Sequence, residues 1–310
     1  MKPSMPNPTL PDTEAADDAS NEATVCVLTF NTNDPSGAGG LSADILSMTS
    51  VGVHVVPIMT GSYVRDTAQI FEHYSVDEDI VTDQARAILE DLTVQAIKVG
   101  FASSPETLAV IAETLSDYAD IPVVAYMPDL SWWNDVQIDI YHDAFQELVL
   151  PQTALLVGNQ STLTRWLLPD WSEERAPSAR DIAMAAGEFG VSYVLVTGIP
   201  LPEQHIDNVL ASPQATLGNI KFERIDATFT GVGDTLSATL AALIASGCDL
   251  SDAFSETMGF LDQCLDYGFR PGMGHVIPDR MFWAQASEDD EDEGATTSNP
   301  FQLPPHDTQH

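Results

Sequence analysis

The chain has 310 residues, 44% of them hydrophobic, and carries 47 acidic side chains against 11 lysines and arginines. This length and composition indicate a globular protein with a substantial core, built as one large α/β domain or two small ones. The formal net charge of −36 argues against nucleic acid and anionic membranes as partners, because binding to either depends on clustered lysine and arginine.

Both ends of the chain are predicted to be disordered tails around a folded domain at residues 24–286. Residues 1–23 are polar and lack the apolar core of a signal peptide. Residues 287–310 carry an acidic run that is typical of a solvating tail. The three cysteines form no CxxC pair, which argues against a disulfide framework or a structural zinc site. Together with the absence of a bilayer-length apolar run, this favours a cytoplasmic location.

Within the folded domain, short apolar runs alternate with amphipathic segments. The runs that predict strands are residues 24–30, 53–58, 96–99, 122–126, 154–157 and 192–196. The segments that predict helices are residues 41–50, 78–91, 105–117, 138–148, 179–189, 235–245 and 251–267. Because the strands read as nearly continuous hydrophobic runs, they favour a parallel, doubly wound sheet with helices on both faces. Residues 206–210 and 220–225 break this rhythm and predict small antiparallel edge strands.

In such folds ligands bind beyond the carboxyl ends of the strands, so the loops that follow strands are the candidate sites. The first is the glycine-rich loop at residues 33–40, where Asp34 is the candidate carboxylate and Gly37 lets the backbone approach a ligand. It is neither a Walker A sequence nor a GxGxxG motif. The alternative interpretation is a tight turn between a strand and a helix.

Several later loops offer weaker candidates, each with a structural alternative. Arg65 and Asp66 follow a strand, and such a pair in a loop is more often structural than catalytic. Lys98 ends an apolar strand, from which its ammonium could instead snorkel to solvent. The remaining candidates after strands are Asn159, Thr197 and Gly198.

The strongest motif is Gly231-Val232-Gly233-Asp234, which follows Thr230 and opens a helix rich in alanine and leucine. Unpaired backbone N–H groups and the positive end of the helix dipole meet there and form an anion site. Such a site suits the charge of a phosphoryl group in transfer, and Asp234 can accept a proton from a substrate hydroxyl. The alternative is an acidic residue that only complements the helix dipole.

These motifs resemble those of a known family. Residues 231–234 match the Gly-x-Gly-Asp signature of the ribokinase superfamily, and residues 34–44 resemble the Asp-x-Ser-Gly-Gly-Ala-Gly-Ile-Gln-Ala-Asp segment of hydroxymethylpyrimidine and phosphomethylpyrimidine kinases. Residues 98–100 and 194–198 are similar to that family's Lys-Ile-Gly and Val-Leu-Val-Lys-Gly segments. Order and spacing hold from about residue 24 to residue 268, and the resemblance implies a ribokinase-like fold.

The resemblance also implies an activity and roles for residues. The activity is ATP-dependent phosphorylation of hydroxymethylpyrimidine or its monophosphate in thiamine biosynthesis, with ATP and Mg²⁺ as cofactors. The catalytic residues would be Asp234 as base and the amides of Gly231, Val232 and Gly233. The residues expected around the substrate are Asp34, Gly37, Arg65, Asp66 and Lys98. Those expected around the nucleotide are Asn159, Thr197, Gly198 and Thr230.

The sequence departs from this family at several positions. Thr162 stands where the family's Asn-x-x-Glu has the glutamate that helps to organise Mg²⁺, and Thr197 replaces the usual lysine. Arg65 occupies the position of a glutamine that reads the pyrimidine, and Met127 that of an aspartate. Asp234 and Arg65 keep pyridoxal kinase open as an alternative. The changes at Thr162 and Thr197 keep open a catalytically impaired paralogue that binds or senses a ligand.

Other features are less specific. The Trp132–Trp133 pair is interpreted as a buried structural pair, with a lid or a dimer contact as the alternative, so a homodimer is left open. The Gly/Pro-rich loop at residues 269–275 either closes over the nucleotide or leads the chain to the sheet edge. The seven histidines form no ligand-spaced cluster, so no metal site built from protein side chains is expected.

Overall fold

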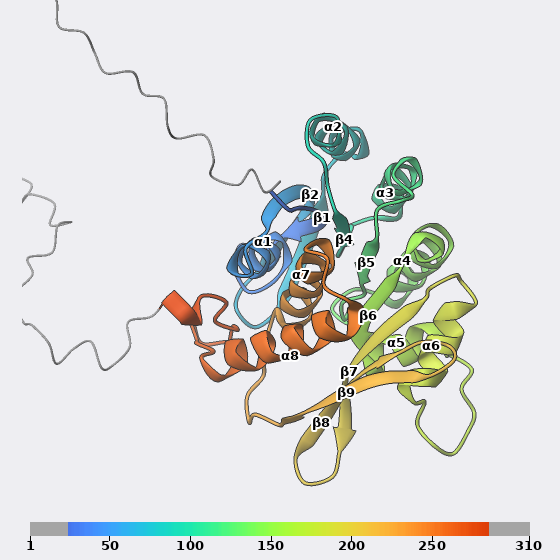
Figure 1. Cartoon of the computed structure of the whole chain (residues 1–310), viewed down its shortest axis with the longest axis vertical. Coiled ribbons are helices and arrows are strands. Elements are labelled where there is room, and N and C mark those ends of the chain that lie inside the picture. The colour runs from blue at the N-terminus through green and yellow to red at the C-terminus, as the bar shows by residue number, and fades with distance from the viewer. Residues whose placement is uncertain (1–23, 285–310) are drawn as a thin grey trace, which may run out of the picture.

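A nine-stranded sheet crosses the part of the chain that the computed structural model describes, residues 24–284 (Figure 1). The tails predicted at residues 1–23 and 287–310 lie outside the described residues. In chain order the strands are β1 (Cys26–Asn33), β2 (His54–Arg65), β3 (Ile70–Ser75), β4 (Ala96–Val99), β5 (Val123–Tyr126), β6 (Leu155–Asn159), β7 (Tyr193–Leu201), β8 (His205–Ala211) and β9 (Thr216–Glu223). Their order across the sheet is β3-β2-β1-β4-β5-β6-β7-β8-β9.

The sheet is parallel in its centre and antiparallel at both edges. Strands β2, β1, β4, β5, β6 and β7 pair in parallel, so their carboxyl ends share one edge. Strand β3 returns antiparallel to β2, and β8 and β9 form an antiparallel extension of β7. The predicted parallel sheet and the antiparallel strands near residues 206–225 are confirmed.

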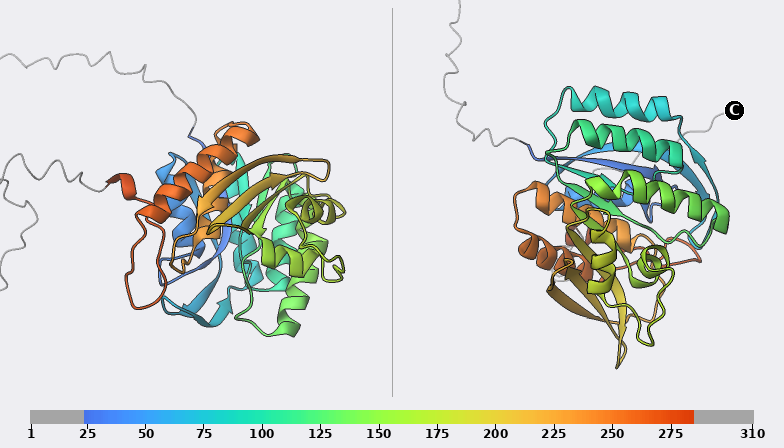
Figure 2. Two further views of the ribbon diagram at one scale, coloured as in Figure 1. Left: turned by 90° about the horizontal axis from the view of Figure 1, so that it is seen from below. Right: turned by 90° about the vertical axis from the view of Figure 1, so that its right-hand side faces the viewer.

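Helices cover both faces of the sheet, as predicted (Figures 1 and 2). One face carries α2 (Glu78–Leu89), α3 (Pro105–Asp117), α4 (Asp135–Leu148), α5 (Gln160–Leu167) and α6 (Ala179–Gly187). The other face carries α1 (Gly40–Ser50), α7 (Val232–Ala245) and α8 (Leu250–Asp266). Short 3₁₀ turns lie at Leu150–Gln152 and Phe282–Ala284.

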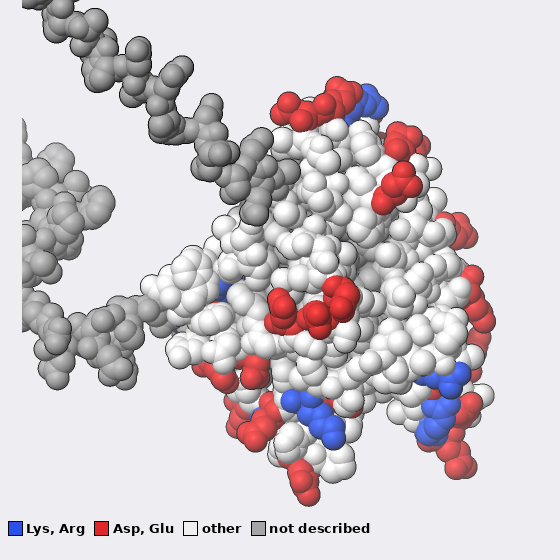
Figure 3. Space-filling model, in the orientation of Figure 1, with Lys and Arg blue, Asp and Glu red and all other residues white. Residues whose placement is uncertain are grey.

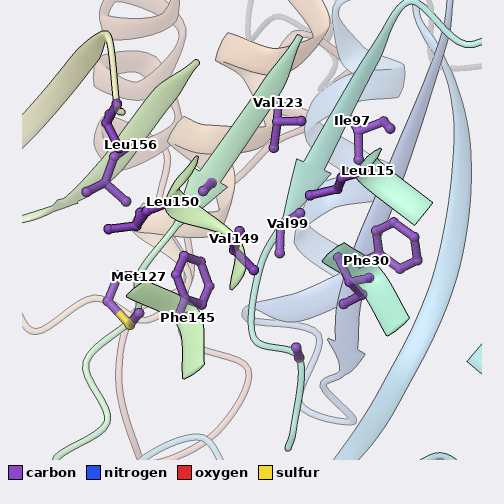
Figure 4. Packing of buried hydrophobic residues seen from close by; sticks show 14 of the residues in the cluster. Phe30, Ile97, Val99, Leu115, Val123, Met127, Phe145, Val149, Leu150 and Leu156 are labelled. Atoms are coloured by element: carbon purple, nitrogen blue, oxygen red, sulfur yellow. The ribbon is translucent and has the colours of Figure 1, made fainter. Parts of the chain in front are cut away.

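Two hydrophobic clusters hold these layers together. On one face Phe30 and Val99 of the central strands pack in the same cluster as Phe145 of α4 (Figure 4). On the other face Val27 lies in a second cluster with Leu240 of α7. Successive strand residues point to opposite faces, so β1 contributes to both clusters. Burial of each such side chain stabilises the fold by roughly 1.5–3 kcal/mol. This packing holds the ends of the strands, which carry the site, in place.

Two elements were not predicted from the sequence. Strand β2 extends well beyond the expected residues 53–58 and pairs with the unpredicted β3, so the two form a hairpin at the sheet edge. Much of this hairpin is exposed, and a half-exposed edge strand lacks the continuous apolar run by which the central strands were found. Helix α5 is only 8 residues long, and a helix of two turns gives little periodic signal.

The structure also shows the surroundings of the two tryptophans and of the Gly/Pro-rich loop. Trp132 and Trp133 stack with ring centroids 5.6 Å apart, and both stay partly exposed rather than buried. The loop at residues 269–275 contacts the turn of the β2–β3 hairpin, where Gly274 and His275 donate their backbone N–H groups to Thr67. The loop therefore bridges toward the hairpin at one edge of the sheet.

The surface reflects the composition. Acidic side chains far outnumber lysine and arginine on the face seen in Figure 3. Among residues 24–284, no helix is both long enough and apolar enough to span a membrane.

Candidate active site

The candidate site lies where the carboxyl ends of β1 and β4 meet the first turns of α1 and α7. Gly231 is the N-cap of α7 and has a φ of 87°, a left-handed conformation that glycine adopts without steric cost. Its carbonyl accepts the first helical bond, from the Thr235 N–H at 2.9 Å. This geometry leaves the N–H groups at the start of α7 free to face a ligand.

Asp234, in the first turn of α7, is held by three donors from distant parts of the chain. Its Oδ1 accepts hydrogen bonds from Asn31 Nδ2 at 2.9 Å and from Lys98 Nζ at 3.2 Å. Its Oδ2 accepts one from the Gly40 N–H at 3.1 Å. The Asp234 side chain is 15% exposed, so the carboxylate is oriented by the protein yet reachable by a substrate.

Lys98 lies at the centre of a buried network of charges. Its ammonium is fully buried and contacts Asp44 Oδ1 at 2.5 Å as well as Asp234. The second Asp44 oxygen accepts hydrogen bonds from Thr29 Oγ1 at 2.6 Å and Asn31 Nδ2 at 3.0 Å. Burial acts to lower the pKa of Lys98, but the two carboxylates outweigh it and raise that pKa. The snorkelling interpretation of Lys98 is therefore wrong, because the side chain points inward.

Asp34 organises the glycine-rich loop between β1 and α1. Its Oδ1 accepts from the Ser36 N–H and hydroxyl at 2.9 and 2.6 Å, and its Oδ2 accepts from the Gly39 N–H at 2.8 Å. Arg65 Nη1, at the end of β2, lies 3.1 Å from the same Oδ2. Four donors thus engage a carboxylate that offers about four lone-pair sites.

Gly37 and Asp66 shape turns beside this carboxylate. Gly37 has a φ of 73° and donates its N–H to the Asp34 carbonyl at 3.0 Å. Asp66 is exposed, and its Oδ1 accepts from the N–H groups of Ala68 and Gln69. These bonds, that of Gln69 foremost, lower the pKa of Asp66. Asp66 therefore caps the hairpin turn, with its carboxylate turned to the backbone.

The glycine-rich loop at residues 33–40 touches the second glycine-rich segment, Gly231–Asp234 at the start of α7. A Cβ added to Gly231 would overlap the Ala38 carbonyl oxygen, and one added to Gly39 would lie 3.0 Å from Asp234 Oδ2. Close approach of backbone to backbone is what brings the Asp34 loop and the α7 N-terminus to one point. Side chains at either glycine would force them apart.

A cavity of about 290 Å³ opens on the other side of the α7 N-terminus. Its lining consists of apolar, glycine and uncharged polar residues: Tyr126, Val157, Gly158, Asn159, Thr197, Gly198, Ile206, Asn208, Phe222, Phe229, Gly231, Val232, Gly233, Leu236, Leu261 and Leu265. No charged side chain lines the cavity within the described residues. Its size and apolar wall are typical of a small-molecule site.

The residues expected around the nucleotide are mostly brought together here. Asn159 caps α5 by accepting from the Thr162 N–H at 2.8 Å, and the Gly198 N–H donates to Asn208 Oδ1 at 3.3 Å. Thr197 lies on the same wall. Thr230 does not line the cavity; its hydroxyl contacts His275 Nδ1 at 2.8 Å.

Four residues at the site were not predicted to be part of it. Asn31 and Asp44 orient Asp234 and Lys98, and Tyr126 lines the cavity with its hydroxyl packed against Gly233. Burial, followed by the charge of Asp234, raises the pKa of Tyr126, so its hydroxyl keeps its proton.

Arg280, which is buried, contacts both glycine-rich loops. Asp44 closes the motif at residues 34–44, which was the available signal.

Comparison with known proteins shows the family of this chain. The phosphomethylpyrimidine kinase family matches residues 34–279. The chain belongs to this family. A hydroxymethylpyrimidine/phosphomethylpyrimidine kinase of Mycobacterium bovis is 28% identical over 257 residues, which cover 80% of this chain and 91% of that protein. The corresponding kinase of Rhizobium meliloti is 27% identical over 263 residues, covering 81% and 94%.

Solved structures place this kinase in the ribokinase-like fold. An ADP complex of Bacillus subtilis pyridoxal kinase matches with a TM-score of 0.76 at 20% identity, covering 85% of this chain and all of that one. Phosphomethylpyrimidine kinase from Clostridium difficile matches with a TM-score of 0.64 at 18% identity, covering 78% of this chain and all of that one. The predicted fold is confirmed.

Proposed function

We propose that this kinase transfers the γ-phosphoryl group of ATP to the hydroxymethyl group of hydroxymethylpyrimidine. The resulting monophosphate is then the acceptor in a second transfer. The observation that carries the proposal is Asp234, which is held at the N-terminus of α7 by Asn31, Lys98 and Gly40. On one side of it lies the Asp34 loop and on the other the uncharged cavity. A base between a glycine-rich loop that could receive the acceptor and a cavity that could receive the nucleotide suits phosphoryl transfer to a hydroxyl.

In this mechanism Asp234 Oδ2 takes the proton of the substrate hydroxyl. The hydroxyl oxygen forms a bond to the γ-phosphorus, and the bond from that phosphorus to the bridging oxygen of ADP breaks, so ADP leaves with the electron pair. Lys98 and Asn31 hold Oδ1 during the step and keep the carboxylate aligned. The amides at the start of α7 stabilise the negative charge on the transferred group.

ATP and Mg²⁺ would bind in the uncharged cavity. Among residues 24–284 there is no group of three or more His, Cys, Asp and Glu side chains arranged to hold a metal, and the cavity wall offers amide and hydroxyl oxygens from Asn159 and Thr197. These residues fit a Mg²⁺ ion whose other ligands are phosphate and water oxygens. Such an ion would neutralise phosphate charge during transfer.

Arg65 favours the phosphorylated form of the acceptor. The resemblance assigns contact with the aminopyrimidine to Asp34, but four donors already engage that carboxylate. An anionic substrate group would draw Arg65 toward itself, because guanidinium binds phosphate in a bidentate way. Asp34 Oδ2 would then be freed for the substrate amine.

The test is an assay with ATP, Mg²⁺ and three acceptors: hydroxymethylpyrimidine, its monophosphate and pyridoxal. We expect turnover of the two pyrimidines, and a loss of about 10²–10⁴-fold in Asp234→Asn. The control is Asp252→Asn, which alters an exposed acid in the first turn of α8. Turnover of pyridoxal alone would contradict the acceptor, and ligand binding without any turnover would contradict the activity.

A further inference from the structure

Arg280 is a buried cation that touches both glycine-rich loops. It follows α8 in the chain, and 2% of the residue is exposed. Its Nη2 donates to the Ala38 carbonyl at 2.5 Å and to the Gly231 carbonyl at 3.3 Å, and its Nε donates to Thr235 Oγ1 at 2.9 Å. Its Nη1 lies 3.5 Å from the Gly37 carbonyl. One guanidinium thus joins the acceptor loop to the N-terminus of α7.

These contacts determine where the neighbouring amides point. The peptide unit is planar and trans, so its carbonyl and its N–H point in opposite directions. Because Arg280 draws the Ala38 carbonyl to itself, the Gly39 N–H points the other way, toward Asp34 Oδ2 at 2.8 Å. The Gly231 carbonyl is held by Arg280 and Thr235, so the Val232 N–H points away from the guanidinium.

The charge of Arg280 lies close to the anion site at the N-terminus of α7. Within residues 24–284 its hydrogen-bond acceptors are three carbonyls and one hydroxyl, and none is a carboxylate. Burial lowers the pKa of Arg280, while the carboxylate of Asp234, without hydrogen bonding, acts to raise it. A guanidinium stays protonated in proteins. Its positive charge therefore lies behind the anion site, and no carboxylate of the described part of the chain is hydrogen-bonded to it.

We propose that Arg280 is a positioning residue for phosphoryl transfer, which locks the two loops together and adds positive charge where the transferred phosphoryl group passes. The inference rests on the proposed kinase activity. It goes beyond the motif residues because Arg280 lies outside both glycine-rich segments and acts through backbone carbonyls.

The test compares Arg280→Met with wild type in turnover, in affinity for ADP, and in affinity for ADP with aluminium fluoride, a mimic of the transferring phosphoryl group. We expect turnover to fall about 10²-fold, comparable to the loss of one oxyanion donor, because the amides that Arg280 orients would no longer be held in place. Affinity for ADP should change by less than about threefold, while the added affinity for aluminium fluoride disappears. Arg175→Met is the control, because Arg175 is exposed and paired with Asp181.

Two outcomes would overturn the proposal. One is a folded Arg280→Met that keeps wild-type turnover; the other is an equal loss of affinity for ADP with and without aluminium fluoride, which indicates a purely structural role. If Arg280→Met does not fold, Arg280→Lys decides. Its single nitrogen cannot serve both loops, so turnover should fall about tenfold while the melting temperature stays close to wild type. Wild-type turnover in Arg280→Lys would contradict the proposal.

The aluminium fluoride measurement needs no acceptor, so it separates this inference from the proposed substrate. A wild-type protein that phosphorylates neither pyrimidine, yet binds ADP with aluminium fluoride in an Arg280-dependent way, would contradict the substrate and support the role of Arg280.

Discussion

The acceptor side and the nucleotide side of the site differ sharply in charge. Around the proposed acceptor site lie three carboxylates, Asp34, Asp44 and Asp234, and two cations paired with them, Arg65 and Lys98. The cavity on the other side of α7 has no charged side chain on its described wall. The chain has only 11 lysines and arginines, so their concentration beside the acceptor is informative.

This difference follows from what each side must do. On the proposed acceptor side the protein must orient a base and the reacting group of the substrate, which takes fixed charges in a low-dielectric setting. A nucleotide brings its own charge and its own Mg²⁺, so amide groups and a helix N-terminus suffice to receive it. The scarcity of basic residues is therefore compatible with the activity.

Removing the central cation should break the charged half most severely. In Lys98→Met, Asp44 and Asp234 lose their shared partner in a fully buried place. Breaking a buried ion pair from one side costs about 3–5 kcal/mol, and urea denaturation should reveal a loss of this size together with lost turnover. Lys221→Met, on the exposed face of β9, is the matched control. A loss below about 1 kcal/mol, the range of surface pairs, would contradict the network.

Gly231→Ala tests the boundary between the halves. The substitution forces a Cβ against the Ala38 carbonyl at a φ of 87°. Gly247 has the same φ with nothing within 4 Å of an added Cβ. Gly247→Ala should therefore cost only the backbone strain, roughly 1–2 kcal/mol, with turnover intact. Gly231→Ala should cost more in thermal denaturation and abolish turnover; equal behaviour of the two would contradict the contact between the loops.

Alkaline pH should lower the stability of the fold through groups on both sides of the site, Lys98 in the charged half and Tyr126 in the wall of the cavity. Lys98 and Tyr126 both have a folded-state pKa above the unfolded value, so each contributes stability that is complete below pH 10 and is lost as pH rises further. The urea midpoint should fall from pH 9 to pH 11. Tyr126→Phe removes one titrating group and should lessen the slope. An unchanged slope in that variant would show that Tyr126 does not take part.

Adding a carboxylate at Thr162, next to Asn159 of the cavity wall, should have the smallest effect. Thr162 is buried at the start of α5, and its hydroxyl has no hydrogen-bond partner among the described residues. Thr162→Glu restores the family glutamate beside the Asn159 cap. It should lower the Mg²⁺ concentration for half-maximal rate by about threefold, a modest gain for one added ligand of the metal. Ser161→Glu, one residue earlier and exposed, should leave it unchanged; equal effects would reflect general electrostatics.

The sequence predicted the central sheet well because buried parallel strands are continuous apolar runs, as in β4, which has the expected bounds. It missed β3 because Ile70–Ser75 forms an exposed edge strand with no such run. The motif at Gly231–Asp234 was recognisable because glycines and an acid opened a helix. Arg280 was not, since its partners are backbone carbonyls of residues far away in sequence, and no side-chain pattern records them.

The contacts of the loop at residues 269–275 have a kinetic consequence. Gly274 and His275 hydrogen-bond to Thr67 in the hairpin turn, and His275 also contacts Thr230, next to Gly231. Opening of the hairpin away from the site would therefore break bonds that reach the start of α7. Local opening in this region is expected to be cooperative, with the hairpin and the loop exchanging their amide hydrogens as one unit. The opening that admits the acceptor would then also change the contacts at the start of α7, so both would depend on one motion.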